Sequence, residues 1–348
     1  MAVMPRILAR LHNLAPGTRP FLASLLLGAA GLAGLHAWWL LTPTPLIQAG
    51  ARVVEIGPHQ GVMGVAQQLE TEGVIRSRLG FLVLAALRGT ARSLKAGEYE
   101  LPRDVNTVQI LRFLEEGKVR QHPVLFPEGG TARELARTLE AEGLTQAEAV
   151  QRLSQDARFL WTLGLPGPTI EGYLFPDTYR FFKGLTPEEM LGRMVHRLRA
   201  KVTDELLAQA ESLGLTFHQL LTLASIIEKE AVIREEMPLI SAVFWNRMKR
   251  DMPLQADPTV QYALGKDRQA LTRDDLQVDS PFNTYRIRGL PPGPIASPGK
   301  AAIVAALNPA KVNYLYFVST GDQRRHFFSV TLEQHNSAVA RYRVAKAR

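Results

Sequence analysis

Apolar side chains recur at three- and four-residue spacing through residues 216–232, which read TFHQLLTLASIIEKEAV. This spacing predicts one amphipathic helix, and at about 100° per residue its apolar positions cover an arc of roughly 120°. Glu228 falls inside that arc, whereas Lys229 points away from it. A carboxylate on a core-facing stripe must be paired, protonated or open onto a cleft. The helix alone therefore allows two interpretations: a structural carboxylate held by an arginine or by backbone N–H groups, or a functional acid.

A second pattern is the uncharged apolar run of residues 21–41, whose only titratable group is His36. Such a run is long enough to cross a hydrocarbon core of about 30 Å, which predicts a single N-terminal transmembrane helix. The preceding residues 1–20 contain three arginines and no acid, so the positive-inside rule places this tail in the cytoplasm and everything after the helix outside. The alternative is a cleaved signal peptide, but the length of the run and the lack of a clean small-x-small site argue against cleavage.

Beyond a proline-containing linker at residues 42–50, residues 51–121 predict a small α+β module. A strand at 53–56 leads into a helix that ends at Gly73, and a shift of 70 residues repeats this unit with a strand at 124–126. The module is similar to the LysM-type subdomain that binds amino-sugar polymers, and a role as scaffold or spacer is the alternative. The shift aligns Ala66, Leu69, Glu70, Glu72 and Gly73 with Ala136, Leu139, Glu140, Glu142 and Gly143.

Residues 122–348 predict a larger, mostly helical α+β domain, so the exported part as a whole belongs to the α+β class. Capping patterns predict helices that open at Thr145 and Thr186. Near the end of the chain, residues 314–318 and 327–330 predict a strand pair that precedes a final helix.

Four polar or proline-rich stretches of this domain are hard to explain by packing alone. Asp257 precedes Pro258, a pair that predicts a helix N-cap followed by proline at the first helical position. The loop at 289–299 contains four prolines and has few N–H donors, so it suits a fixed wall for an extended substrate. The four stretches are EGYLFPDTY (171–179), LQADPTV (254–260), DSPFNTY (279–285) and GLPPGPIASPG (289–299).

The amino-acid composition excludes several classes of catalytic and binding site. The chain has no cysteine, which excludes disulfides, thiol catalysis and thiolate metal sites. His326 and His335 have no third ligand near them in the sequence, and no dinucleotide or P-loop fingerprint occurs, so we expect neither a metal nor a cofactor. Without the arginines of the tail the formal net charge falls from +8 to +5, which suits an anionic polymer or a membrane surface. Nucleic acid is not an expected partner, because the basic residues are scattered and the domain is predicted to lie outside the cytoplasm.

Several segments together form a specific resemblance. They are EGYLFPDTY, LASIIEKEA, the NRM of 246–248, LQADPTVQYALG, DSPFNTY, GLPPGPIASPG, and YLYFV followed by HFFSVTLEQHN. In this order they resemble the endolytic murein transglycosylases, the MltG or YceG-like family. The likeness covers about residues 52–343 and includes the single N-terminal anchor. Ser297 stands where the family usually has asparagine, and Phe282 where it often has tyrosine.

The resemblance implies a lytic transglycosylase that cleaves the MurNAc–GlcNAc bond within nascent peptidoglycan strands and so ends their elongation. The family's catalytic glutamate corresponds to Glu228, and its nucleophile is the C6 hydroxyl of the MurNAc whose bond breaks, so the products end in 1,6-anhydro-MurNAc. A single-pass location in the bacterial inner membrane, an extracytoplasmic catalytic domain and membrane-bound peptidoglycan synthases as partners are also implied. Gln255, Asp257, Asn283 and Tyr285 are the candidates for holding the sugar rings.

Two other functions are open at this point. The first is a muramidase that uses water, with Asp257 as its second carboxylate. The second is a non-catalytic, membrane-tethered peptidoglycan-binding scaffold in which Glu228 is a structural residue. The reaction products distinguish the muramidase from the lytic transglycosylase. The activity of a Glu228 variant distinguishes the scaffold from either enzyme.

Overall fold

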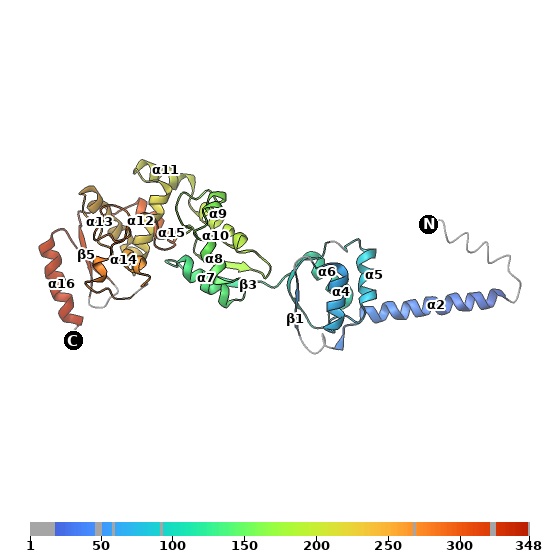
Figure 1. Cartoon of the computed structure of the whole chain (residues 1–348). Helices are drawn as coiled ribbons and strands as arrows, with labels where there is room; N and C mark the ends of the chain where they lie inside the picture. Colours follow the sequence, from blue (N-terminus) through green and yellow to red (C-terminus); the bar gives the residue numbers. More distant parts are fainter. Residues whose placement is uncertain are drawn as a thin grey trace. The chain divides into compact units, whose positions relative to one another are not determined.

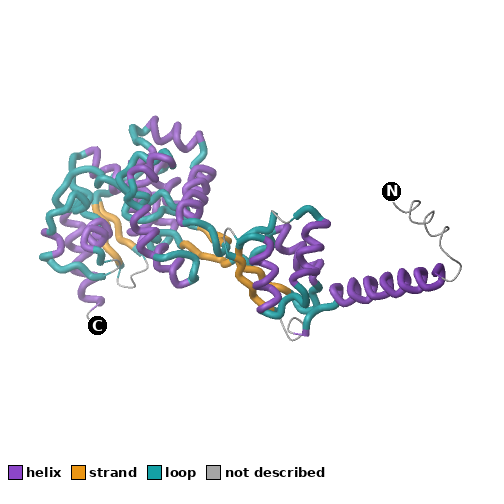
Figure 2. Tube along the Cα trace, turned by 45° about the vertical axis from the view of Figure 1, so that its right-hand side comes forward, coloured by secondary structure: helices purple, strands orange, loops and turns teal. Residues whose placement is uncertain are grey.

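The computed structural model describes residues 18–45, 51–57, 60–90, 93–266, 269–320 and 325–346. The described chain combines helices with short antiparallel strand pairs, which confirms the α+β class (Figure 2). It divides into two compact units, Met1–Gln121 with Phe182–Gly184, and His122–Phe181 with Leu185–Arg348. Residues 1–17 of the predicted cytoplasmic tail and residues 46–50 of the predicted linker lie outside the described residues.

The first described helix is α2, Thr18–Leu41 (Figure 1). Among the described residues it is the one helix long and apolar enough to cross a membrane, over Ala23–Leu40. Five of its leucines are exposed: Leu25, Leu26, Leu27 at 74% of full exposure, Leu32 at 70%, and Leu35. An apolar helix exposed over most of its length is typical of a segment that lipid covers.

The first unit builds a small core between one strand pair and three helices. β1 (Arg52–Ile56) pairs antiparallel with β2 (Gly97–Leu101), so that Val54 lies opposite Tyr99. The helices are α4 (Val62–Thr71), α5 (Arg78–Leu87) and α6 (Thr107–Glu116). Apolar side chains of all five elements are buried together, among them Val54, Ile56, Val65, Leu69, Phe81, Tyr99, Ile110 and Leu111.

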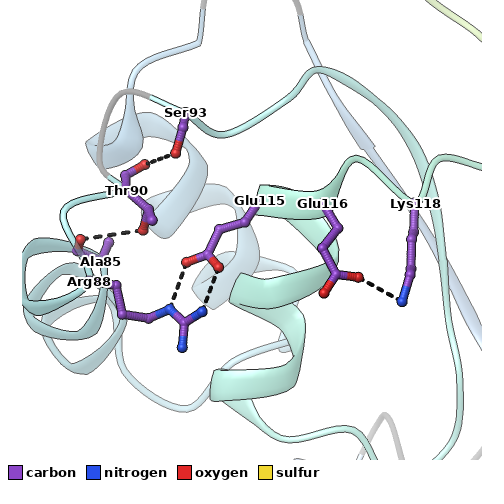
Figure 3. A network of polar contacts seen from close by, with 7 residues as sticks. All are labelled: Ala85, Arg88, Thr90, Ser93, Glu115, Glu116 and Lys118. Atoms are coloured by element: carbon purple, nitrogen blue, oxygen red, sulfur yellow. Dashed lines mark hydrogen bonds and ion pairs between the residues drawn. The ribbon is translucent and has the colours of Figure 1, made fainter.

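An ion pair joins α5 to α6 at the surface of this unit. Arg88, the C-cap of α5, donates from Nε and Nη2 to the two carboxylate oxygens of Glu115 at 2.9 and 2.8 Å (Figure 3). The hydrogen bonds and charge of the guanidinium lower the pKa of the Glu115 carboxyl. Beside this pair, the Ser93 hydroxyl donates to the carbonyl of Thr90 at 3.0 Å. The Arg88–Glu115 pair therefore adds to the core in holding α5 against α6.

The second unit begins with a strand pair and four helices. β3 (His122–Phe126) pairs antiparallel with β4 (Asp177–Phe181). The predicted cap at Thr186 is confirmed, because its hydroxyl accepts from the N–H of Glu189, whose carboxylate accepts from the N–H of Thr186. The helices are α7 (Ala132–Ala141), α8 (Ala147–Leu153), α9 (Ala157–Thr162) and α10 (Pro187–Lys201).

The predicted cap at Thr145 is wrong, because α8 begins after Gln146, which makes no side-chain capping bond. The repeated glutamate provides the cap instead. Glu140 accepts from the N–H of Ala147, the first residue of α8, at 3.1 Å. Its counterpart in the first unit, Glu70, accepts from the N–H of Arg78, the first residue of α5, at 2.9 Å. Each copy of the repeat thus caps the helix that follows it.

Helix α12 (Phe217–Glu230) lies at the centre of the remaining part of this unit, in contact with α11, α13, α14 and α15 (Figure 1). Every residue from Leu220 to Ile227 is buried, so packing on all sides fixes the turns that lead to the end of the helix. β5 (Tyr316–Ser319) and β6 (His326–Ser329) form the predicted strand pair. The other elements are α11 (Asp204–Ser212), η1 (Arg234–Glu236), α13 (Met237–Lys249), α14 (Asp257–Leu264), η2 (Asp275–Gln277), α15 (Lys300–Leu307) and α16 (Leu332–Lys346).

Candidate functional site

The helix predicted over 216–232 is confirmed as α12, with Thr216 as its N-cap. The Thr216 hydroxyl accepts from the N–H of Gln219 at 3.2 Å, and the Gln219 side chain accepts from the N–H of Thr216 at 2.9 Å. Three partly buried residues, Glu228, Lys229 and Glu230, end the helix. Because successive side chains leave a helix about 100° apart, these three face different surroundings.

Glu228 reaches the start of α15. Its Oε2 accepts a hydrogen bond from the backbone N–H of Gly299, the N-cap of α15, at 2.9 Å. Burial raises the pKa of the Glu228 carboxyl, the Gly299 hydrogen bond opposes that shift, and the negative charge of Glu128 adds to it. A carboxyl group with a raised pKa keeps its proton closer to neutral pH, as a general acid must.

Glu128 is a second carboxylate near Glu228 that the sequence analysis missed. It pairs with Arg234 at 2.7 Å, and a Cβ placed on Gly299 would collide with its carboxylate. Glu128 follows strand β3 in the turn PEGG, whereas Arg234 and Glu228 lie about a hundred residues later in the sequence. No periodic pattern marks such a residue; the only signal was an acid beside two glycines between a strand and a helix.

Ser297 fixes the turn that Glu128 begins, through its backbone. Its carbonyl accepts from the N–H of Gly129 at 2.9 Å, and its N–H donates to the carbonyl of Gly130 at 2.8 Å. A Cβ placed on Gly129 would lie 3.6 Å from Cγ of Glu228, so this turn borders the catalytic candidate. The Ser297 hydroxyl is buried and has no hydrogen-bond partner among the described residues. The turn is therefore held by the backbone of Ser297 and not by its side chain.

Three of the predicted sugar contacts gather at another face of the helix end, around Glu230. Tyr285 Oη donates to Asp257 Oδ1 at 2.5 Å, and Arg247 Nη1 donates to Gln255 Oε1 at 3.1 Å. Burial and the charge of Asp257 raise the pKa of Glu230 to about 8, against the opposing charge of Arg247. The structure thus brings Gln255, Asp257 and Tyr285 together. It adds Glu230 and Arg247, to which the sequence pattern assigned no role.

Arg247 is buried and holds the backbone of this cluster through hydrogen bonds. It is 7% exposed and donates to the carbonyls of Leu254 at 2.9 Å and Leu315 at 2.7 Å, and its guanidinium lies 5.2 Å from the ring centroid of Tyr316. Gln255 has a φ of 51°, a left-handed conformation that costs about 1–2 kcal/mol in a residue other than glycine. The hydrogen bonds from Arg247 offset this cost and leave Gln255 exposed at the surface of the cluster.

The prediction that Asp257 caps a helix is wrong by one residue. Ala256 is the N-cap of α14, Asp257 is the first helical residue and Pro258 the second. The cause is a tertiary contact, because the N–H of Ala256 donates to the hydroxyl of Thr284 at 3.0 Å. The Asp257 side chain makes no capping bond and instead accepts from the Tyr285 hydroxyl.

Asn283 lies beneath the cluster and does not face a cleft. It is fully buried, and its amide donates to the carbonyls of Leu276 at 3.0 Å and Val278 at 2.8 Å. Its Oδ1 accepts from the N–H of Tyr285 at 3.0 Å. Asn283 therefore shapes the loop that carries Tyr285.

The proline-rich loop at 289–299, predicted as a fixed wall for an extended substrate, is held against the core over most of its length. Residues 293–299 are buried, and the N–H of Ile295 donates to Ser225 Oγ on α12 at 3.0 Å. At the exposed end of the loop, the carbonyl of Pro292 lies 2.7 Å from Nε2 of His218. The loop packs against α12 because burial of its apolar side chains is favourable there. This packing places the Gly299 N–H beside the Glu228 carboxylate.

A cleft of about 430 Å³ opens beside Lys229. Tyr262 and Phe282 line it with their ring centroids 5.0 Å apart, so the second departure from the family pattern is a cleft residue. Glu171 also lines it, with both carboxylate oxygens 3.2 Å from the N of Ala132. Burial raises the pKa of Glu171 to about 7, although its backbone hydrogen bonds oppose the shift.

Within the described ranges, no three histidines or acids gather as a metal site would require. His326 instead pairs with Glu236, whose carboxylate lies 2.7 Å from Nδ1 and accepts from the backbone N–H at 3.0 Å. The His335 ring stacks on Tyr316 with centroids 5.3 Å apart. Both histidines therefore have structural surroundings.

Comparison with known proteins adds to this geometry. The chain is 32% identical over 334 residues to the endolytic murein transglycosylase of Bacillus subtilis (strain 168), covering 91% of each chain. It is 33% identical over 351 residues to the protein of the same name from Streptococcus pneumoniae serotype 2 (strain D39 / NCTC 7466), covering 91% of this chain and 63% of that one.

Solved structures and family patterns agree with these relatives. The crystal structure of a yceG-like protein from Listeria monocytogenes superposes with a TM-score of 0.57 at 35% identity, over 82% of this chain and 98% of that one. The model of the YceG-like family matches residues 54–341. The resemblance found in the sequence is thereby confirmed, and the chain belongs to the YceG-like family.

Proposed function

We propose that this protein is a membrane-anchored endolytic transglycosylase that cleaves the MurNAc–GlcNAc bond within nascent peptidoglycan strands and ends their elongation. The names of the Bacillus and Streptococcus relatives support the reaction class. The observation that carries the proposal is Glu228, a partly buried acid with a raised pKa at the fixed end of α12.

In the proposed reaction one carboxyl group performs both proton transfers. Protonated Glu228 donates its proton to the glycosidic oxygen as the bond from that oxygen to C1 of MurNAc breaks. The resulting carboxylate accepts the proton of the C6 hydroxyl as O6 bonds to C1, which closes the 1,6-anhydro ring and restores the acid. Between the two steps, the Gly299 N–H stabilises the carboxylate.

Gln255, Asp257 and Tyr285 are the proposed sugar contacts, because their side chains are exposed or partly exposed and lie together at the end of α12. A carboxylate, an amide and a phenol supply the donors and acceptors that sugar hydroxyl and acetamido groups require. Asn283 acts on these contacts indirectly, since its hydrogen bond fixes the backbone of Tyr285.

A muramidase that uses water is the second candidate, and Glu128 is the observation that favours it. The negative charge of Glu128 raises the pKa of Glu228, whereas the charge of Asp257 raises the pKa of Glu230. Glu128 therefore fits the role of second carboxylate better than Asp257. Against this role, Glu128 is paired with Arg234, and a carboxylate in an ion pair is a weaker base.

The location and partners belong to the same proposal. Helix α2 would anchor the chain in the bacterial inner membrane as a single span, with the second unit outside the cytoplasm and membrane-bound synthases supplying the nascent strands. The strand–helix–helix–strand order from β1 to β2 supports a LysM-like module next to this anchor. The alternative is a non-catalytic scaffold tethered to the membrane, and cleavage of glycan strands by the purified protein would exclude it.

Two variants of the full-length protein in detergent test the role of Glu228 on purified glycan strands. Glu228→Gln keeps the shape but removes the transferable proton, so turnover falls by about 10²–10⁴-fold. Glu230→Gln replaces an acid that is mostly protonated at pH 7 with a neutral amide, so its loss stays below about 10-fold. Glu211→Gln, an exposed change on α11, is the matched control. A large loss from Glu230→Gln with a small one from Glu228→Gln would assign the acid to Glu230 instead.

A further inference from the structure

Two arginines of α7 face the cleft beside Lys229. Arg133 and Arg137 are exposed, lie one turn apart and line the cleft. Neither makes a hydrogen bond or an ion pair with any residue that the structure describes. Like charges at this spacing destabilise a helix by a few tenths of a kcal/mol, and an anion bound between them would relieve that cost.

The two acids of the cleft offset only part of the charge of these arginines, and both accept hydrogen bonds at the start of α7. Glu134 accepts from the N–H of Thr131 at 2.8 Å in the capping box. Glu171 accepts from the N–H of Ala132, and its carboxyl is half protonated near pH 7. The two guanidinium charges therefore exceed the full charge of Glu134 plus the partial charge of Glu171, which leaves a net positive charge on this wall of the cleft.

The cleft begins next to the catalytic candidate. A Cβ placed on Gly129 would lie 3.6 Å from Cγ of Glu228 and 3.6 Å from Cδ of Lys229, so both side chains flank the same glycine. Lys229 then continues into the cleft wall. A substituent on the sugar that Glu228 protonates is thus within reach of the cleft.

The volume and the remaining walls fit such a substituent. About 430 Å³ accommodates a small organic group but not a folded domain. Gln155 and Gln261 supply amide donors and acceptors, and Tyr262 with Phe282 supplies an apolar surface. These are the groups that recognise a short peptide ending in a carboxylate.

We propose that this cleft is a subsite for a carboxylate carried on the lactyl arm of a muramyl residue, bound by Arg133 and Arg137. Neutral amino sugars would leave both guanidinium groups unpaired, whereas the lactyl arm bears either the carboxylates of a stem peptide or, where the peptide is absent, its own carboxylate. The inference rests on the proposed function, because it takes the muramyl sugar beside Glu228 as given. It adds that charge on the arm selects where the strand is cut.

Binding tests this subsite separately from cleavage. Fluorescence anisotropy of labelled strands with the full-length Glu228→Gln protein avoids turnover during the measurement. Three strands are compared: one with free stem-peptide carboxylates, one stripped of peptides so that only lactyl carboxylates remain, and one whose stem carboxylates are amidated. Arg133→Gln and Arg137→Gln are the test variants. Arg158→Gln, an exposed change on α9 outside the cleft, is the matched control.

We expect each cleft substitution to weaken binding of a carboxylate-bearing strand about 3- to 10-fold and to reduce its salt dependence, while Arg158→Gln changes neither. Tight binding of the first strand alone identifies the stem peptide as the source, and equal binding of the stripped strand identifies the lactyl carboxylate. If the amidated strand binds as tightly as the first, or the cleft variants behave as the control does, the subsite is refuted even when the wild-type chain cleaves strands. If the wild-type chain binds by charge but does not cleave, the proposed function fails and the subsite stands.

Discussion

Replacing Glu171 by glutamine measures the cost of a buried acid in the candidate substrate cleft. Glu171 is 6% exposed, and burial raises its pKa from 4.5 to about 7. The native state therefore retains a proton that the unfolded state releases as the pH rises from 4.5 to 7, so the free energy of unfolding falls across this window. The interval between these pKa values corresponds to about 3 kcal/mol in the free energy of unfolding, and this contribution is lost by pH 8.

The glutamine variant keeps an oxygen to accept from the Ala132 N–H but cannot ionise. Near pH 4.5 the wild type and Glu171→Gln should unfold within about 0.5 kcal/mol of each other, because both carry a neutral side chain. At pH 8 the variant should be more stable by about 3 kcal/mol, or about 6–12 °C in the unfolding midpoint of a unit this size.

Thermal unfolding of the full-length protein at both pH values provides the measurement, with exposed Glu211→Gln as the control. A variant that is less stable than the wild type at pH 8 would show that the native carboxyl is ionised and held by a charge partner. If the stability difference between the wild type and the variant is the same at both pH values, the Glu171 carboxyl does not titrate between pH 4.5 and pH 8. Either result would contradict the assignment of a raised pKa.

Four further outcomes are expected. Tyr285→Phe removes the donor to Asp257, so steady-state kinetics should show KM raised about 3- to 10-fold with kcat nearly unchanged. Ser297→Ala should change stability by less than about 0.5 kcal/mol in denaturant unfolding, because the buried hydroxyl has no partner among the described residues. Gly299→Ala places a Cβ against the Glu128 carboxylate, so turnover should fall at least about 10-fold while circular dichroism stays unchanged. A reporter that is active only after export, fused to the carboxyl terminus, should be active, and a signal only from a cytoplasmic reporter would contradict the predicted topology.

Local patterns predicted the central helix well. The apolar spacing and Thr216 placed α12 to within two residues at each end, because burial and capping act within one segment. The same pattern isolated Glu228, since an acid on the buried face of a helix is visible in the sequence alone. The 70-residue repeat is also visible in the sequence alone, and it aligns Glu70 with Glu140, which both cap the helix that follows.

Features that depend on distant residues were missed. The start of α14 was predicted one residue late, because the hydroxyl of Thr284 accepts from the N–H of Ala256 and makes that residue the N-cap. Arg247 belongs to the NRM segment of the resemblance but was assigned no role, yet it is buried and donates to three separate carbonyls. Glu128 meets Glu228 only through the fold. The candidate site is therefore assembled by tertiary contacts that periodicity does not encode.

The mass of the newly formed ends tests the central claim most directly. Full-length protein is incubated with defined glycan strands, and the products are analysed by mass spectrometry. Intramolecular attack by the C6 hydroxyl predicts 1,6-anhydro-muramyl ends from cuts within the strands, and these ends should disappear in Glu228→Gln. Reducing ends heavier by one water molecule would contradict the single-carboxyl mechanism and assign the protein to the water-using hydrolases.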